Sequence, residues 1–173
     1  VRVTACDVVP TASDNVWIRE KEHFSPKVII TPGGKTVLDF GQNIAGYIAF
    51  TVTAKEGQEV FLRFGRCWMR TGVYPENIQC SNKKDIASAA GALYLQRGEN
   101  HYKTSFAIFG FQLVQIETDV DWKPEDFTAI AVYSDMEQRT FFDSSNELLN
   151  RLVESTLWSA RNNSADIPTD CPT

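Results

Sequence analysis

The sequence has 173 residues, a length that fits one domain or one domain with part of another. Its composition is that of a globular protein, because 43% of the residues are hydrophobic, 12% are aromatic and 23% are charged. The formal net charge of -5 without a Lys/Arg cluster argues against a nucleic-acid partner, and no apolar run approaches the roughly 18 residues that a membrane helix needs.

Residues 1–26 indicate a connector from an upstream domain. Breakers such as Pro10 and Pro26 separate short apolar pieces, which could also be strands or a tail around the next domain. The segment has neither an initiator Met nor the apolar core of a signal peptide. We therefore expect the chain to be part of a longer protein, and the sequence does not choose between a cytoplasmic and a periplasmic or secreted location.

Residues 27–142 have the pattern of a β domain. Turns such as Pro32-Gly33-Gly34 separate short runs in which apolar side chains alternate with polar ones. The spacing predicts a mainly β fold, an antiparallel β-sandwich, in place of parallel βαβ units. An interruption is expected at 41–43, a bulge or bend at Gly110, and strands at 28–30, 36–40, 46–53, 59–64, 92–96, 106–116, 127–133 and 139–142.

A helix is predicted from about residue 145 to 160. Ser144-x-x-Glu147 is a capping box, which is typical of a helix start. A helix with an apolar face must cover a surface, so it either lies on the sandwich or opens a helical domain. That face consists of Leu148, Leu149, Leu152, Val153, Thr156 and Leu157.

The last residues place a carboxylate and a thiol between two prolines, in Ile167-Pro168-Thr169-Asp170-Cys171-Pro172-Thr173. Each Pro fixes its own φ and disfavours the helical region for the residue before it. We therefore expect Asp170 on a stiff, extended segment, a suitable mount for a side chain that points into a cleft. The alternative is a helix-ending turn with a solvated Asp. The four cysteines have no Cys-x-x-Cys spacing and the chain has two His, so no zinc site is expected.

Several motifs occur in order along the chain: Asp39-Phe40-Gly41-Gln42-Asn43-x-x-Gly46, the spaced set Phe64, Gly65, Gly72, Tyr74, Glu76 and Asn77, then Gly110-Phe111, Val132-Tyr133-Ser134-Asp135-Met136 and Ile167-Pro168-Thr169-Asp170-Cys171-Pro172. Together they resemble bacterial α-L-rhamnosidases, the inverting glycoside hydrolases of family 78. The terminal motif is the most specific of them. Two positions depart from the family pattern, because Arg66 replaces a usual Glu and Gln112 follows Phe111 where the family often has Arg.

The resemblance implies a jelly-roll or concanavalin-like sandwich over 27–142 and the start of an (α/α)6 catalytic barrel over 143–173. It implies that the parent enzyme hydrolyses terminal α-L-rhamnose from glycosides or polysaccharides by inversion, without a cofactor. Asp170 would bind the sugar, while the general acid and base would lie after Thr173. The isolated chain is therefore expected to be inactive, and its partners are the rhamnose-containing substrate and the remaining domains of the parent.

A second candidate site lies in the long segment 65–91, since long loops in compact sandwiches are often functional. Trp68 and Tyr74 could stack on sugar C–H groups, with Glu76 and Asn77 binding hydroxyls. The alternative is an interdomain loop that packs on the barrel.

The motif around Gly41 is interpreted as structural, because Asp39 and Asn43 can satisfy a tight turn there. Two other functions stay open for the chain as a whole: a carbohydrate-binding sandwich that belongs to no active enzyme, and a purely structural interdomain sandwich.

Overall fold

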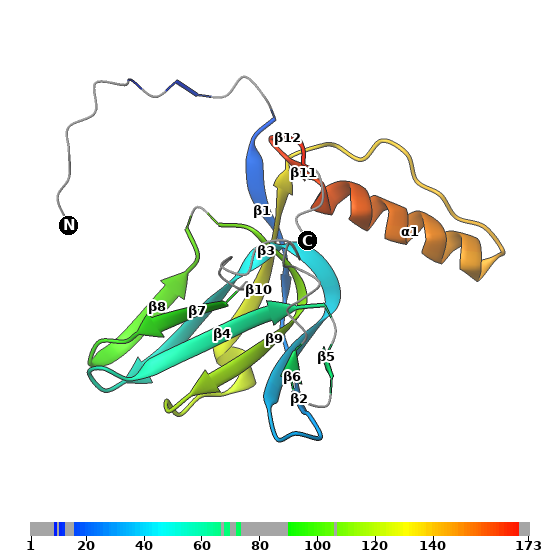
Figure 1. The fold of residues 1–173 in the computed structure, drawn as a ribbon. Coiled ribbons are helices and arrows are strands. Elements are labelled where there is room, and N and C mark those ends of the chain that lie inside the picture. The colour runs from blue at the N-terminus through cyan, green and yellow to red at the C-terminus, as the bar shows by residue number, and fades with distance from the viewer. Residues whose placement is uncertain are drawn as a thin grey trace, which may run out of the picture.

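The structure, a computed structural model, describes residues 9, 11–12, 16–66, 68–69, 72–73, 90–105 and 107–169. Strands dominate it, with one α-helix near the C-terminal end of the described part (Figure 1). The elements are β1 (Ile18–Phe24), β2 (Lys27–Ile30), β3 (Thr36–Ala54), β4 (Glu59–Gly65), β5 (Trp68–Met69), β6 (Gly72–Val73), β7 (Ala90–Tyr94), β8 (Gly98–Lys103), β9 (Phe109–Thr118), the 3-10 helix η2 (Pro124–Asp126), β10 (Phe127–Ser134), α1 (Glu147–Asn162), β11 (Ser164–Ala165) and β12 (Ile167–Pro168).

The main sheet is antiparallel throughout and is organised around β3. Its strand order is β1-β10-β3-β9-β4-β7, with β2 and β8 also paired to β3. The first half of β3 pairs with β2 and β9, whereas residues 46–54 pair with β10 and β8. One strand thus serves both layers, and the predicted antiparallel β-sandwich is confirmed (Figure 1).

The core lies between the two layers. Alternate side chains of β3, β4, β9 and β10 are buried there, as the period of two in the sequence predicts. Phe111 contacts Phe40 and Phe64, with ring centroids 6.0 and 5.0 Å away. Phe127 packs 5.2 Å from Phe50. These aromatic contacts join β3, β4, β9 and β10 into one core.

A bulge in β3 replaces the interruption predicted at 41–43. The register with β9 moves from Asp39–Leu113 to Ile44–Phe111, so four residues of β3 oppose one of β9. Gly41 has a φ of 77°, and its N–H donates to Asp39 Oδ1 at 2.8 Å. The structural interpretation of Asp39 is therefore confirmed, because its side chain satisfies the backbone of this tight turn.

The bulge predicted at Gly110 is wrong. Gly110 pairs with Ala45 in regular register between Phe109–Gly46 and Phe111–Ile44. The irregularity lies on the partner strand, whose extra residues follow Asp39. A glycine within an apolar run marks a close approach as readily as a bulge, and the sequence does not tell the two apart.

Part of the segment predicted as a connector belongs to the sheet. Residues 18–24 form β1, which pairs with β10 from Ile18–Ser134 to Phe24–Ala129. The prediction is corrected for these residues. Their sequence, Ile-Arg-Glu-Lys-Glu-His-Phe, hides a strand because edge strands carry charged side chains. That the residues before β1 lead to another domain stays a prediction.

The strand predicted at 139–142 does not form. Residues 135–146 contain no helix or strand, and Phe141 and Phe142 are exposed. The strand β10 offers these residues no edge, because it is already paired with β1 and with β3.

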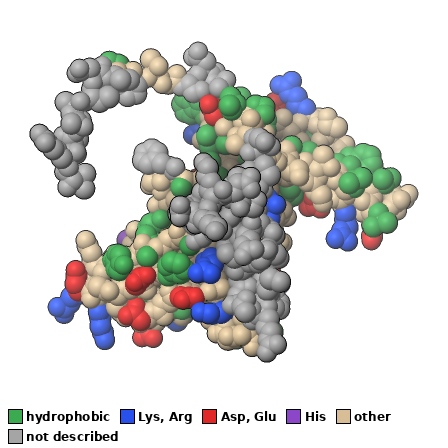
Figure 2. All heavy atoms as spheres, viewed as in Figure 1, with side chains coloured by type: hydrophobic (Ala, Val, Ile, Leu, Met, Phe, Trp, Pro, Cys, Tyr) green, Lys and Arg blue, Asp and Glu red, His purple; other side chains and the backbone are tan. Residues whose placement is uncertain are grey.

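The helix α1 is held at its C-terminal end and projects from the sandwich at its N-terminal end (Figure 1). Its N-cap is Asn146, whose Oδ1 accepts from Leu148 N at 3.0 Å. The predicted capping box is wrong, because the Ser144 hydroxyl donates to Asn150 Oδ1 instead. Leu148 and Leu152 are 75% and 61% exposed, and Figure 2 shows hydrophobic side chains on this projecting part.

Candidate functional site

The residues predicted to contact sugar fall mostly outside the described part. Asp170, Tyr74, Glu76 and Asn77 lie beyond it. Trp68 begins β5, which pairs with β6, but its side chain is outside the description. Both candidate sites therefore stay predictions, and the structure bears instead on the residues that lead to Asp170.

The segment before Asp170 is a small hairpin of β11 and β12, at the C-terminal end of α1. Thr169 N donates to the carbonyl of Asn163 at 2.7 Å, which ties the last described residue to the end of the helix. The turn residue Asp166 has a φ of 72°, and its N–H donates to Ser134 Oγ at 2.9 Å. Two elements, α1 and β10, thus fix the chain that leads into Asp170.

The end of α1 is fastened to the bulge of β3 by one amide side chain. Asn162 Nδ2 donates to the carbonyl of Asn43 at 3.0 Å, and Asn162 Oδ1 accepts from Ala45 N at 2.8 Å. Trp158, one turn earlier, packs against Phe24 of β1 with ring centroids 6.0 Å apart. The helix therefore contacts both β3 and β1, the two strands that flank β10.

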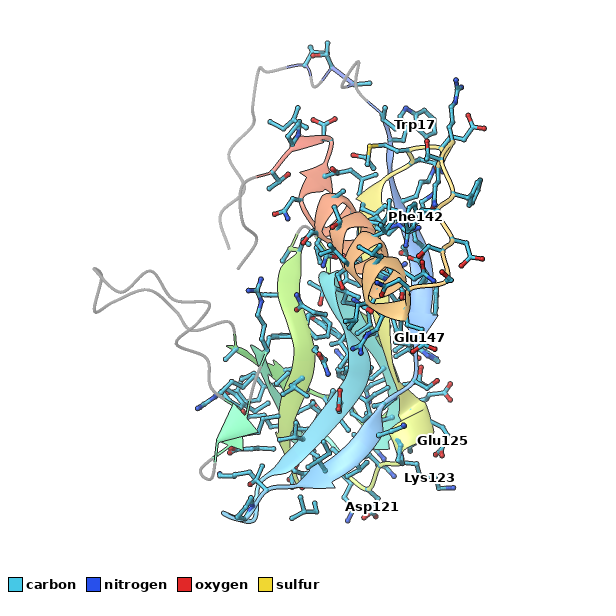
Figure 3. The ribbon with its side chains drawn as sticks, turned by 90° about the vertical axis from the view of Figure 1, so that its right-hand side faces the viewer. Trp17, Asp121, Lys123, Glu125, Phe142 and Glu147 are labelled. Carbon is cyan, nitrogen blue, oxygen red and sulfur yellow. The ribbon has the colours of Figure 1, made fainter. Side chains whose placement is uncertain are left out.

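A polar groove of about 360 Å³ lies between α1 and the bulge. Gln42 and Asn43 form the wall on β3, and Arg151, Glu154 and Trp158 are among the residues on the helix. The Oδ1 atom of Asn43 is buried and has no hydrogen-bond partner in the described part of the chain. Figure 3 labels Glu147 at the start of α1 and Phe142 on the segment before the helix.

Charged and phenolic groups line the other side of the helix end. Arg161 lies 5.0 Å from the Trp158 ring and 3.8 Å from Glu22 Oε1. Tyr133 donates its O–H to Glu22 at 2.8 Å. Burial first, and then the hydrogen bond to Glu22, raise the pKa of Tyr133 to about 12. A neutral phenol at this position therefore holds β1 against β10 over the physiological pH range.

We expect the free energy of unfolding to fall between about pH 10 and about pH 12 in part through Tyr133. In this interval the unfolded chain has lost the phenol proton while the folded chain keeps it, so the stabilisation is complete below the lower value and is lost as the pH rises. Tyr133→Phe should flatten the alkaline part of a denaturation series. Tyrosinate absorbance that shows no late-titrating group in the folded chain would contradict this.

Two negative findings concern the described residues alone. No three His, Cys, Asp or Glu side chains among them are grouped so that they could share a metal ion. No helix in the described ranges is long and apolar enough to cross a membrane.

Two family models match consecutive parts of the chain. Residues 29–133 match the family model described as the bacterial alpha-L-rhamnosidase concanavalin-like domain. Residues 137–173 match the bacterial alpha-L-rhamnosidase 6 hairpin glycosidase domain. The chain belongs to the bacterial α-L-rhamnosidase family. The first match ends one residue before the end of β10, and the second begins in the segment that leads to α1.

Individual α-L-rhamnosidases agree with this assignment. The chain is 31% identical to one from Alteromonas sp. (strain LOR) over 140 residues, which cover 79% of the chain and 15% of that relative. It is also similar to the crystal structure of the native enzyme from Aspergillus terreus, with 32% identity, a TM-score of 0.83 and coverage of 94% of this chain and 19% of the other.

The Streptomyces avermitilis α-L-rhamnosidase, solved in complex with L-rhamnose, has 26% identity, a TM-score of 0.81 and coverage of 94% and 16%. The chain thus spans less than a fifth of each of the α-L-rhamnosidases compared here.

The α-L-rhamnosidase motifs gain physical explanations from the structure. Gly41 permits the bulge, and Gly46 lies where a Cβ atom would meet the Ile130 carbonyl oxygen. Ser134, in the Val132–Met136 motif, holds the hairpin before Asp170. From the sequence, Asn162 fits only a weak N-glycosylation pattern, Asn162-Asn163-Ser164. Its bonds to β3 could not be predicted, because no local pattern marks a side chain whose partners lie more than a hundred residues earlier.

Proposed function

We propose that this chain is part of an inverting α-L-rhamnosidase that releases terminal α-L-rhamnose from glycosides or polysaccharides. It would contribute the β-sandwich, residues 27–142 together with β1, and the first helix of the catalytic domain, from residue 143. The supporting observation is the match of two consecutive rhamnosidase family models to residues 29–133 and 137–173. The second match favours an enzyme over a binding module or a structural module.

Asp170 supplies the substrate contact in this proposal. An ionised carboxylate accepts hydrogen bonds from sugar hydroxyls and stabilises the positive charge that develops at the anomeric carbon. The hairpin of β11 and β12 ends at Pro168, two residues before Asp170 in the sequence. In inverting glycosidases a general acid protonates the leaving oxygen and a general base activates water, with roughly 6.5–9.5 Å between the two carboxyl groups. Both would follow Thr173, so the 173-residue chain alone would be inactive.

The test compares three proteins on an aryl α-L-rhamnoside. The longer enzyme that contains this chain should release the aglycone, and the 173-residue chain should not. Asp170→Ala in the longer enzyme should lower kcat/KM by about 100-fold, because each hydrogen bond to a charged group contributes about 1.5–3 kcal/mol. Proton NMR of the first product should show β-L-rhamnose, the inverted anomer.

Asp121→Ala is the matched control, because Asp121 is an exposed carboxylate in the turn before η2 (Figure 3). It should keep the activity of the unmodified enzyme. Hydrolysis by the 173-residue chain, an α-anomer as the first product, or an unchanged kcat/KM in Asp170→Ala would each refute the corresponding part of the proposal.

A further inference from the structure

We infer that Asn162 is a positioning residue for Asp170, because its side chain locks the end of α1 to the bulge of β3. The sandwich then takes part in shaping the sugar site. This inference rests on the proposed function only for the role of Asp170 itself, whereas the contacts of Asn162 are those of the described chain.

The side chain of Asn162 takes the place of a further strand residue beside β3. The pairing of β10 with β3 ends at Ala131–Gly46, and the next backbone groups of β3 bond to the Asn162 amide. A carboxamide has one acceptor group and one donor group, as a peptide unit does. The Asn162 amide therefore bonds to β3 as a peptide unit of a neighbouring strand would. Ala45 is buried, and a buried N–H without a partner is costly.

Other side chains at position 162 would not satisfy both backbone groups of β3. Asp keeps the acceptor for Ala45 N but offers no donor to the carbonyl of Asn43, and its charge repels that oxygen. Leu keeps the approximate size and loses both bonds. Asn is thus the residue whose side chain, at this length, satisfies both groups of the bulge.

The hairpin of β11 and β12 connects Asn162 with Asp170 along the chain. Asn163 follows directly, and its carbonyl accepts from Thr169 N at 2.7 Å. Thr169 precedes Asp170 in the sequence. Ser134 holds Asp166, the turn residue of the same hairpin, at 2.9 Å. The end of α1 and the end of β10 therefore hold the hairpin in place. Asn162 in turn fixes the end of α1 to β3.

Without the Asn162 side chain, α1 would keep its other contacts with the sandwich. Trp158 would still pack on Phe24, and Arg161 would still reach Glu22 and Gln138. The helix would stay attached but would lose its register against the bulge. A misplacement of about 1 Å at a catalytic site can cost about 100-fold in rate.

The experiment is a double-mutant cycle in the longer α-L-rhamnosidase. Asn162→Asp should lower kcat/KM for an aryl α-L-rhamnoside by about 100-fold and weaken L-rhamnose binding. In the Asp170→Ala background the same change should cost less than about 3-fold, because residues that act through one contact are not additive. Asn150→Asp is the matched control, since Asn150 also lies on α1 and its side chain bonds to Asp143 and Ser144, within the segment before the helix. It should keep nearly full activity.

Each outcome decides one point. If Asp170→Ala keeps full activity, the proposed role of Asp170 fails. If Asp170→Ala loses activity and a folded Asn162→Asp does not, or if the two losses are additive, the inference about Asn162 fails alone. Should Asn162→Asp not fold, Ser134→Ala applies the same test to the second anchor of the hairpin. Ser134→Ala should lower kcat/KM by about 10-fold, and this loss should not add to that of Asp170→Ala. Additive losses would overturn the inferred coupling between the hairpin and the sugar site.

Discussion

Gly46→Ala should lower the free energy of unfolding of the chain by about 3 kcal/mol, since overpacking of this kind costs about 1–3 kcal/mol or more. A Cβ atom at this position would lie 2.0 Å from the Ile130 carbonyl oxygen and 3.1 Å from the Cα atom of Ala131. Both contacts are with the backbone of β10, which pairs with β3 at this point. No side-chain rotation relieves them, so the two strands must separate.

Chemical denaturation followed by tryptophan fluorescence measures this change. Gly91→Ala is the matched control, because Gly91 lies in β7 and a Cβ atom there would meet nothing within 4 Å. It should leave the stability unchanged or raise it slightly, since Ala restricts the unfolded chain more than Gly does. Equal losses in the two variants would show that the close approach of β10 is not what position 46 requires.

Phe127→Ala should cost about 3–5 kcal/mol, the range for removing a buried aromatic side chain. Phe127 is 1% exposed and contacts Phe50 and Trp122, with ring centroids 5.2 and 5.4 Å away. It is the first residue of β10 and belongs to the main buried cluster. The substitution would leave a cavity between the two layers of the sandwich. Because β3 joins both layers, the surrounding strands have little freedom to move inward and fill it.

Thermal unfolding provides the measurement, with a fall in Tm on the order of 10 °C for a chain of this size. Phe141→Ala removes the same atoms from a side chain that is 81% exposed. It should change the stability by less than about 0.5 kcal/mol, as exposed substitutions do. A small effect at Phe127, comparable to that at Phe141, would place the core elsewhere.

The strands of the sandwich could be predicted where burial leaves a period of two in the sequence. The stretch from Glu59 to Phe64 is a clear case, because its alternate residues face the core. The continuity of β3 could not be predicted, since Gly41-Gln42-Asn43 resembles a turn and only the partner strand turns it into a bulge. The strand β1 was hidden for the opposite reason. Its charged residues suit an edge strand, and they show no alternation of apolar and polar side chains.

The segment leading to Asp170 could be predicted in part. Prolines indicated an extended backbone, which the structure confirms at Ile167 and Pro168, whereas Asp170 lies outside the described residues. The anchors of that segment could not be foreseen, because Asn162 and Ser134 act on partners that are distant in sequence. A polar residue near a helix end has many local explanations, and only the assembled sheet shows which backbone groups it satisfies.

The sharing of β3 by both layers also sets an order for folding. This strand is complete at Ala54, but its partners β8, β9 and β10 follow much later, the last ending at Ser134. During synthesis β2 can pair with the start of β3 at once, but the rest of β3 waits for partners that come much later in the chain. Pairings between such distant segments form slowly, and unpaired apolar strands aggregate readily. A nascent chain that has not yet reached β10 would depend on chaperones, and the yield of soluble protein should respond to them more than the stability of the finished sandwich suggests.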